Sequence, residues 1–129
     1  MIPVLYYSDV RAAAAWLCRA FGFVERLEIG SHRAQLLFGG GAIVAADGGS
    51  AGPPGGWPTH SIMVRVTGID RHHAAALAGG ATVTMAPADQ PFGERQYSAI
   101  DLAGHRWTFS ETIGDSDPAT WGGILKEPQ

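Results

Sequence analysis

The feature that most constrains the fold is an order of elements that repeats on either side of a glycine- and proline-rich stretch. Residues 47–58 contain Pro-Pro-Gly-Gly at 53–56 and cannot hold a helix or an interior strand, so we interpret them as a linker. The segments before and after it, residues 1–46 and 59–112, each predict one strand, one helix and three further strands. A duplicated module of this kind predicts a single domain of 129 residues.

The first module begins with a β-prone apolar run over residues 2–7. Asp9 is a candidate N-cap for an alanine-rich helix that Gly22 ends. Three strands are then expected over residues 23–29, 32–38 and 42–46. Glycines separate them, and we interpret the triplet at 39–41 as a turn because it precedes a strand and lacks a phosphate-loop lysine.

The second module repeats this order with strands over residues 61–66, 81–85, 95–101 and 106–111. Its helix is expected to be capped by Asp70 and to end at Gly79-Gly80. Its few extra residues fit a predicted loop over 86–93. The tail, residues 113–129, is polar, and Asp117-Pro118 predicts the start of a short helix that Trp121 attaches to the body.

Composition excludes several classes of protein. Apolar residues make up 46% and charged residues 16%, as in a folded globular domain. A net charge of −3 without a basic block argues against nucleic acid, and no apolar run is long enough to span a bilayer. The lone cysteine, Cys18, and the lack of a signal-type segment favour a cytoplasmic protein, in which Cys18 is a small buried hydrophobe.

The stretch 66–110 carries a family resemblance. It runs from Val-Thr-Gly-Ile-Asp at 66–70 through Pro-Phe-Gly-Glu-Arg at 91–95 to the segment Asp101-x-x-Gly-His-Arg-Trp-Thr-Phe109. This resembles the second module of the vicinal oxygen chelate superfamily of glyoxalases, bleomycin-resistance proteins and ring-cleaving dioxygenases. The family commonly has proline after the turn aspartate, where this chain has Leu102. The resemblance implies an α+β fold of two tandem βαβββ modules that form a curved mixed-sheet cup.

The resemblance also implies where a metal would bind, on the first and last strand of each module. Carried over, those positions are Ile2, Ala45, Ser61 and Thr108. A divalent ion needs three or four nitrogen, carboxylate or thiolate donors, and these four residues supply none. No metal and no cofactor are therefore expected.

The remaining metal-binding residue types in the chain are expected to be structural or exposed. Strand alternation turns His60 and Glu111 away from the cup, so we expect structural roles for both. His72 and His73 point in different directions on a helix and are expected to face solvent.

A period of two places a set of side chains together on the cup wall. Arg65 is the most informative of them, because a buried cation needs a partner. It either contacts a ligand or pairs with Glu25, Glu28 or Glu94. Arg95 and Tyr97 are expected to extend the same wall. The loop aromatics Trp57 and Phe92 either overhang the ligand or anchor their loops. The candidate ligand-binding residues are Tyr6, Trp57, Ser61, Met63, Arg65, Phe92, Arg95, Tyr97, Thr108 and Ser110.

Two main classes of function remain open. The first is a metal-independent binding protein that sequesters an aromatic or drug-like small molecule in the cup. The second is an enzyme of the lyase, isomerase or dioxygenase type that acts on a small oxygenated metabolite. A structural or regulatory partner domain is a weaker third. A homodimer is expected, because the relatives usually assemble their cups from paired modules and the half-open sheet edges need covering.

Overall fold

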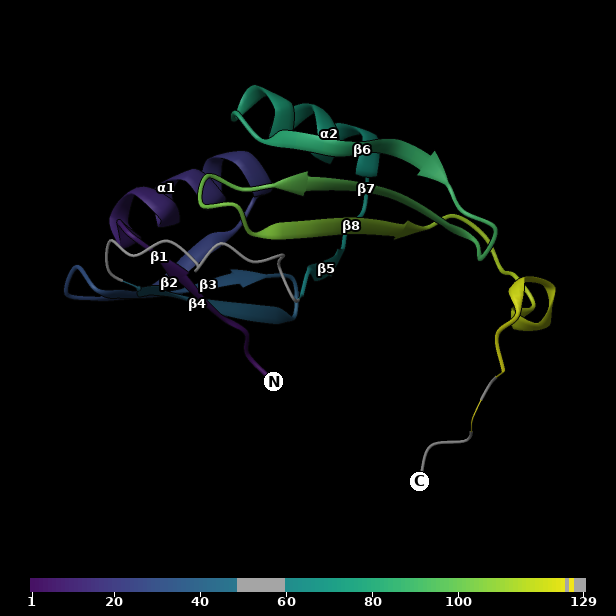
Figure 1. Cartoon of the computed structure of the whole chain (residues 1–129), viewed down its shortest axis with the longest axis horizontal. Helices are drawn as coiled ribbons and strands as arrows, with labels where there is room; N and C mark the ends of the chain where they lie inside the picture. The colour runs from purple at the N-terminus through teal and green to yellow at the C-terminus, as the bar shows by residue number, and fades with distance from the viewer. Residues whose placement is uncertain (49–59, 125, 127–129) are drawn as a thin grey trace.

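The computed structural model describes residues 1–48, 60–124 and 126, which form two four-stranded sheets with one α-helix each (Figure 1). The linker segment 49–59, with Trp57, lies outside the described residues. Both modules have the order strand, helix and three strands, which confirms the predicted α+β fold. The elements are β1 (Val4–Tyr7), α1 (Val10–Phe21), β2 (Val24–Ile29), β3 (Arg33–Phe38), β4 (Gly41–Asp47), β5 (Ile62–Arg65), α2 (Ile69–Ala78), β6 (Thr82–Asp89), β7 (Glu94–Ile100), β8 (Arg106–Thr112) and the 3-10 helix η1 (Pro118–Trp121).

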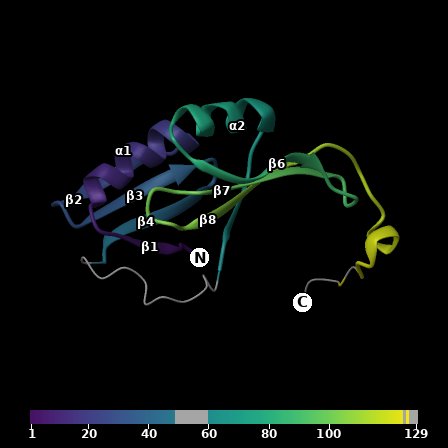
Figure 2. The same ribbon diagram turned by 45° about the horizontal axis from the view of Figure 1, so that its top comes forward.

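The two sheets have the same topology. Their strand orders are β1-β4-β3-β2 and β5-β8-β7-β6. The pairs β1–β4 and β5–β8 are parallel, and the other neighbouring pairs are antiparallel. Each helix covers one face of its own sheet, and the two helices lie side by side (Figure 2). Among the described residues no helix covers the opposite face of either sheet, and we call that face the open face of the sheet.

The two helices begin differently. Asp9 caps α1 as predicted, since its Oδ1 accepts from the Ala12 amide at 3.0 Å. The predicted cap of α2 is wrong: Asp70 lies in the first turn and Gly68 is the N-cap. The capping group is instead the carboxylate of Glu111 on β8, which accepts from the amides of Gly68 and Ile69 at 2.7 and 3.1 Å. These bonds satisfy two otherwise unpaired helix amides and lower the pKa of Glu111.

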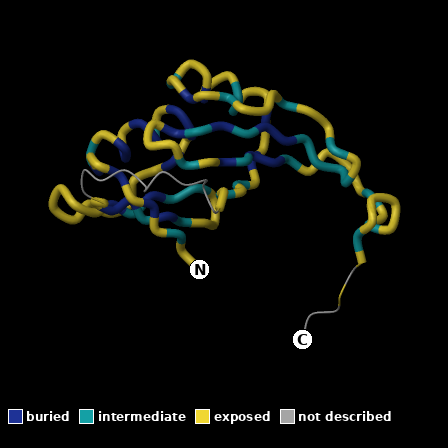
Figure 3. Tube along the Cα trace, in the orientation of Figure 1, coloured by how far each residue is buried: buried dark blue, intermediate teal, exposed yellow. Residues whose placement is uncertain are grey.

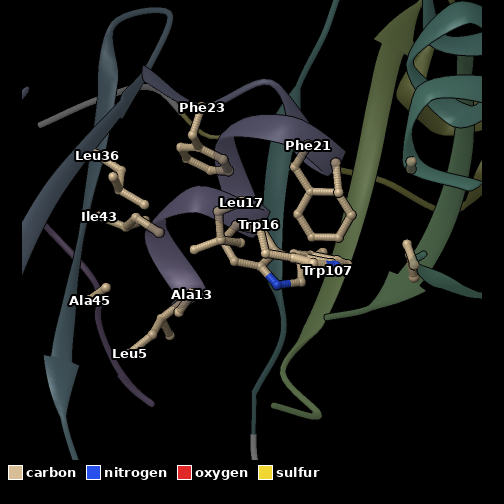
Figure 4. Packing of buried hydrophobic residues seen from close by; sticks show 14 of the residues in the cluster. Leu5, Ala13, Trp16, Leu17, Phe21, Phe23, Leu36, Ile43, Ala45 and Trp107 are labelled. Atoms are coloured by element: carbon tan, nitrogen blue, oxygen red, sulfur yellow. The ribbon is translucent and has the colours of Figure 1, made fainter. Parts of the chain in front are cut away.

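One apolar core joins the two modules. The buried face of α1 lies against β3 and β4, and the ring of Phe21 at its end contacts Trp107 and Phe109 of the second sheet at centroid distances of 5.5 and 5.0 Å (Figure 4). Buried residues follow α1 and the middle of both sheets (Figure 3). Burial of these large rings stabilises the pairing of the modules within one chain.

A buried carboxylate also joins the modules. Asp101, only 6% exposed, accepts from the hydroxyl of Tyr7 on β1 at 2.7 Å and from the indole nitrogen of Trp107 at 3.1 Å. Its other oxygen accepts from the amides of Ala103 and His105, both at 3.0 Å, and so shapes the β7–β8 turn. The sequence indicated only the role in the turn.

Two strand boundaries differ from the sequence prediction by two residues or more, and most of the others differ by one. The first strand begins at Val4, and β6 continues to Asp89 through two register shifts, so residues 86–89 belong to a strand and not to a loop. Among the described helices, none combines the length and apolar character needed to cross a membrane.

Candidate ligand site on the open face of the second sheet

Strand alternation gives the second sheet an apolar face under the helices and an open face of different composition. On β8, Trp107 and Phe109 are buried in the core, while Thr108 and Ser110 lie on the open face. Met63 of β5 pairs with Thr108 and is 61% exposed, and Arg65 pairs with Ser110. The structure therefore brings five of the predicted site residues, these four and Ser61, onto one face.

A shallow depression of about 220 Å³ lies on this face, and polar residues make up the larger part of its lining. Ser98 and Thr108 share a hydrogen bond of 2.9 Å at its floor. Arg106 supplies the positive charge, and among the described residues it has no carboxylate partner. The residues that line the depression are Ser61, Thr84, Met85, Ser98, Ala99, Arg106, Trp107 and Thr108.

A hydrogen-bonded network follows the depression along the same face. Arg65 Nη1 lies 3.2 Å from Glu94 and donates to the Thr112 hydroxyl. Ser110 donates to Glu94 at 2.8 Å, and Gln96 donates to Ser110 at 3.1 Å. Hydrogen bonds from Thr112 and Ser110, together with the Arg65 charge, lower the pKa of Glu94. Glu94 is therefore a weak proton acceptor at neutral pH.

Of the three carboxylates proposed as partners of Arg65, the structure selects Glu94. Glu25 and Glu28 instead pair with Arg11, at 2.6 and 3.2 Å, on the helix side of the first sheet. Arg65 remains 67% exposed in this arrangement, so the pair is a solvent-accessible one. Such pairs are worth at most about 1 kcal/mol.

The predicted face of Arg95 and Tyr97 is wrong. Tyr97 is fully buried on the helix side, where its ring stacks on Phe109 at 5.1 Å. Arg95 lies on the same side and pairs with Asp70 and Asp89 at 3.1 and 2.9 Å. Neither side chain reaches the open face.

His72 was predicted to face solvent, and this too is wrong. Its Nε2–H donates to the carbonyl of Phe21 at 2.7 Å, and its Nδ1 accepts from the hydroxyl of Tyr97. Burial lowers the pKa of the imidazole. Its spacing from the buried residues Ile69 and Ala76 is that of one helix face, a signal in the sequence that would have placed it inward.

The two remaining aromatic candidates lie elsewhere. Phe92 contacts the Trp121 ring at a centroid distance of 5.7 Å, and Ser116 donates to the carbonyl of Pro91 at 3.2 Å. Phe92 therefore attaches the C-terminal segment to its loop. Tyr6, 61% exposed, lies on the open face of the first sheet. That face is largely apolar, and its exposed side chains include Val4, Tyr6, Val24, Leu27 and Ile29.

The residues at the inherited metal positions do not fit a divalent ion. The predicted position in the first module is wrong by one: Ala45 is fully buried beside Leu5, and Val44 takes the place equivalent to Thr108. Valine adds no donor, so the corrected set is as poor as the predicted one. Within the part of the chain that the structure describes, no three His, Cys, Asp or Glu side chains gather as a metal site.

Comparisons with known proteins agree with this fold. The sequence profile of the Glyoxalase/Bleomycin resistance protein/Dioxygenase superfamily matches residues 3–109. The crystal structure of TioX from Micromonospora sp. ML1 is similar, with 34% identity, a TM-score of 0.74 and coverage of 88% of this chain and 98% of TioX. A glyoxalase/bleomycin resistance protein/dioxygenase family enzyme from Burkholderia phytofirmans shares the fold, with 17% identity, a TM-score of 0.69 and coverage of 85% and 95%. An uncharacterized protein of Mycobacterium bovis is 29% identical over 125 residues, which covers 86% of this chain and 82% of that protein. The chain belongs to the Glyoxalase/Bleomycin resistance protein/Dioxygenase superfamily.

Proposed function

We propose that the protein is a metal-independent binding protein that holds an aromatic or drug-like small molecule against the open face of the second sheet. One observation carries this proposal. Where metal-dependent relatives would place their ligating side chains, this chain presents the hydroxyls of Ser61 and Thr108 beside the guanidinium of Arg106. These groups recognise carbonyl and anionic oxygens directly, so the site needs no metal to polarise them.

The floor of the depression can orient an oxygen-bearing ring. A carbonyl or carboxylate oxygen would accept from Arg106 and from one of the hydroxyls that line the site. The thioether of Met85, at the edge of the depression, would contact the ring. A hydrogen bond to a charged donor is worth about 1.5–3 kcal/mol, enough to decide which ring substituent binds.

We propose that a second copy supplies the opposite wall of the site. A depression of about 220 Å³ is small for a drug-sized molecule, so one sheet alone would leave much of the ligand in water. The open face of the first sheet is mostly apolar, although Arg33 and Gln35 also lie on it, and it includes the exposed ring of Tyr6. A homodimer that sets this apolar face opposite the polar floor would bury both faces of a flat ligand.

The chemistry of the face favours binding over catalysis. Among the described residues of the second sheet, Glu94 is the carboxylate of the open face, and its lowered pKa makes it a poor general base. The thiol of Cys18 lies on α1, and burial raises its pKa, which disfavours the thiolate. Neither group is suited to start a reaction on this face.

Ligand-induced thermal shift across a library of uncharged phenols and quinones, with and without EDTA, tests this proposal. Hits should stabilise the protein equally in both conditions. Arg106→Met should weaken a hit by about ten- to a hundredfold, and the matched control Arg71→Met, on the exposed side of α2, should leave it unchanged. Hits that disappear with EDTA, or that bind Arg106→Met as tightly as the parent, would overturn it.

A further inference from the structure

A second concavity of about 360 Å³ lies at the junction of the two modules, between the β3–β4 turn and β5. It is separate from the polar depression, which lies towards β6 and β7. Its volume falls within the range of small-molecule pockets, and its lining is mostly apolar with one charged side chain. The main lining residues are Phe23, Phe38, the glycines 39–41, Ile62, Met63 and Arg65.

The turn at residues 39–41 contains more glycines than its backbone conformation requires. Gly39 has a φ of 55° and needs the freedom of glycine, but Gly40 and Gly41 do not have positive φ. A Cβ added at Gly40 would meet nothing within 4 Å, so close packing does not exclude a side chain there either. The bare backbone leaves one wall of the groove open to a flat ring, and Met63 lines the same groove.

The guanidinium of Arg65 has hydrogen-bond partners on one of its sides. Arg65 uses Nη1 for Glu94 and Thr112, and within the described part of the chain its Nε and Nη2 have no hydrogen-bond partner. Those two nitrogens form one edge of the planar guanidinium, which matches a carboxylate or sulfonate in a two-point contact. Because Glu94 and Thr112 hold the opposite side, the free edge is already oriented.

We propose that this groove is a second binding site, for a flat apolar anion such as an aryl carboxylate or aryl sulfonate. The ring lies along the glycine backbone between Phe38 and Met63, and the anionic group accepts from the free edge of Arg65. The site does not depend on the polar depression, so either site can exist without the other.

The test uses 1-anilinonaphthalene-8-sulfonate, a flat apolar anion whose fluorescence reports its binding, together with amide NMR spectra of the full chain. The amide signals of Gly39, Gly40 and Gly41 should shift on titration, while those of Ser61 and Thr108 should not. Arg65→Met should weaken the sulfonate by about tenfold or more. N-phenyl-1-naphthylamine, which has the same rings without the sulfonate, should bind the parent and Arg65→Met alike.

Two further variants keep the result decisive. Met63→Ala changes an exposed side chain and should weaken both probes without lowering the melting temperature. Arg71→Met, on the exposed side of α2, lies outside both sites and should leave the sulfonate affinity unchanged. Equal sulfonate affinity in Arg65→Met and the parent would overturn the proposal. Shifts confined to Val24 and Leu27 of the first sheet would also overturn it. So would glycine signals that change on dilution of the protein and not on titration, because that result would mean that a second copy covers the groove.

Discussion

Replacing Asp101 with alanine should be among the most destabilising single changes in this chain. The variant loses the acceptor for two buried donors, the Tyr7 hydroxyl and the Trp107 indole N–H, which are 3% and 0% exposed. Leaving a buried donor unpaired costs about 1–3 kcal/mol, so the two together should lower the free energy of unfolding by about 2–6 kcal/mol. The amides of Ala103 and His105 are only part-buried and can turn to water, so they add little.

Urea denaturation measures this loss directly, as a lower midpoint at unchanged slope. Asp117→Ala is the matched control, since that carboxylate caps an exposed 3-10 helix and should cost about 1 kcal/mol or less. Tyr7→Phe removes one donor together with its bond and should cost about 1 kcal/mol, well below Asp101→Ala. A loss of less than 1 kcal/mol in Asp101→Ala would refute the view that this carboxylate joins the modules.

Three other predictions concern pH, capping and assembly. Burial lowers the pKa of His72, so the folded protein favours the neutral imidazole. The stability that this neutral form contributes is complete above the ordinary histidine pKa of about 6.5 and declines as the pH falls. His72→Gln should therefore flatten the decline of the urea midpoint between about pH 7.5 and 5.5. Glu94 and Glu111, whose pKa values are also lowered, lose their contributions at more acidic pH. Glu111→Gln should speed amide hydrogen exchange at Gly68 and Ile69, which it caps, and unchanged protection there would contradict the capping role. Light scattering should give about twice the chain mass of 13.6 kDa, and a stable monomer would remove the proposed second wall of the site.

The sequence predicted the order of elements well because that order depends on local chemistry. Gly22 ends α1 and Asp9 starts it, and both act within one turn of the helix. Alternation on β5 likewise placed Met63 and Arg65 on the open face, since Ile62 and Val64 on the other side are plainly apolar. Where neighbouring residues alone decide an orientation, the sequence was sufficient.

The errors concern residues whose partners are distant in the chain. Both faces of β7 carry polar and apolar residues, so the pattern does not show which face is buried. We placed Tyr97 on the open face because it shares a face with the charged residue Arg95. Arg95 in fact lies near the start of the strand, on the helix side, and pairs there with Asp70 and Asp89. His72 finds its acceptor at the end of α1, which only the packing of the two modules brings near. The cap from Glu111 and the network of Asp101 depend on the same long-range contacts.

The most direct test of metal-independent binding is an amide NMR titration of the chelator-treated protein with the best hit from the thermal-shift library. The account predicts saturable shifts centred on Ser61, Arg106 and Thr108, with the same dissociation constant before and after chelator treatment. If the shifts arise only after a divalent metal is added back, or if they lie away from the open face of the second sheet, the central claim is contradicted.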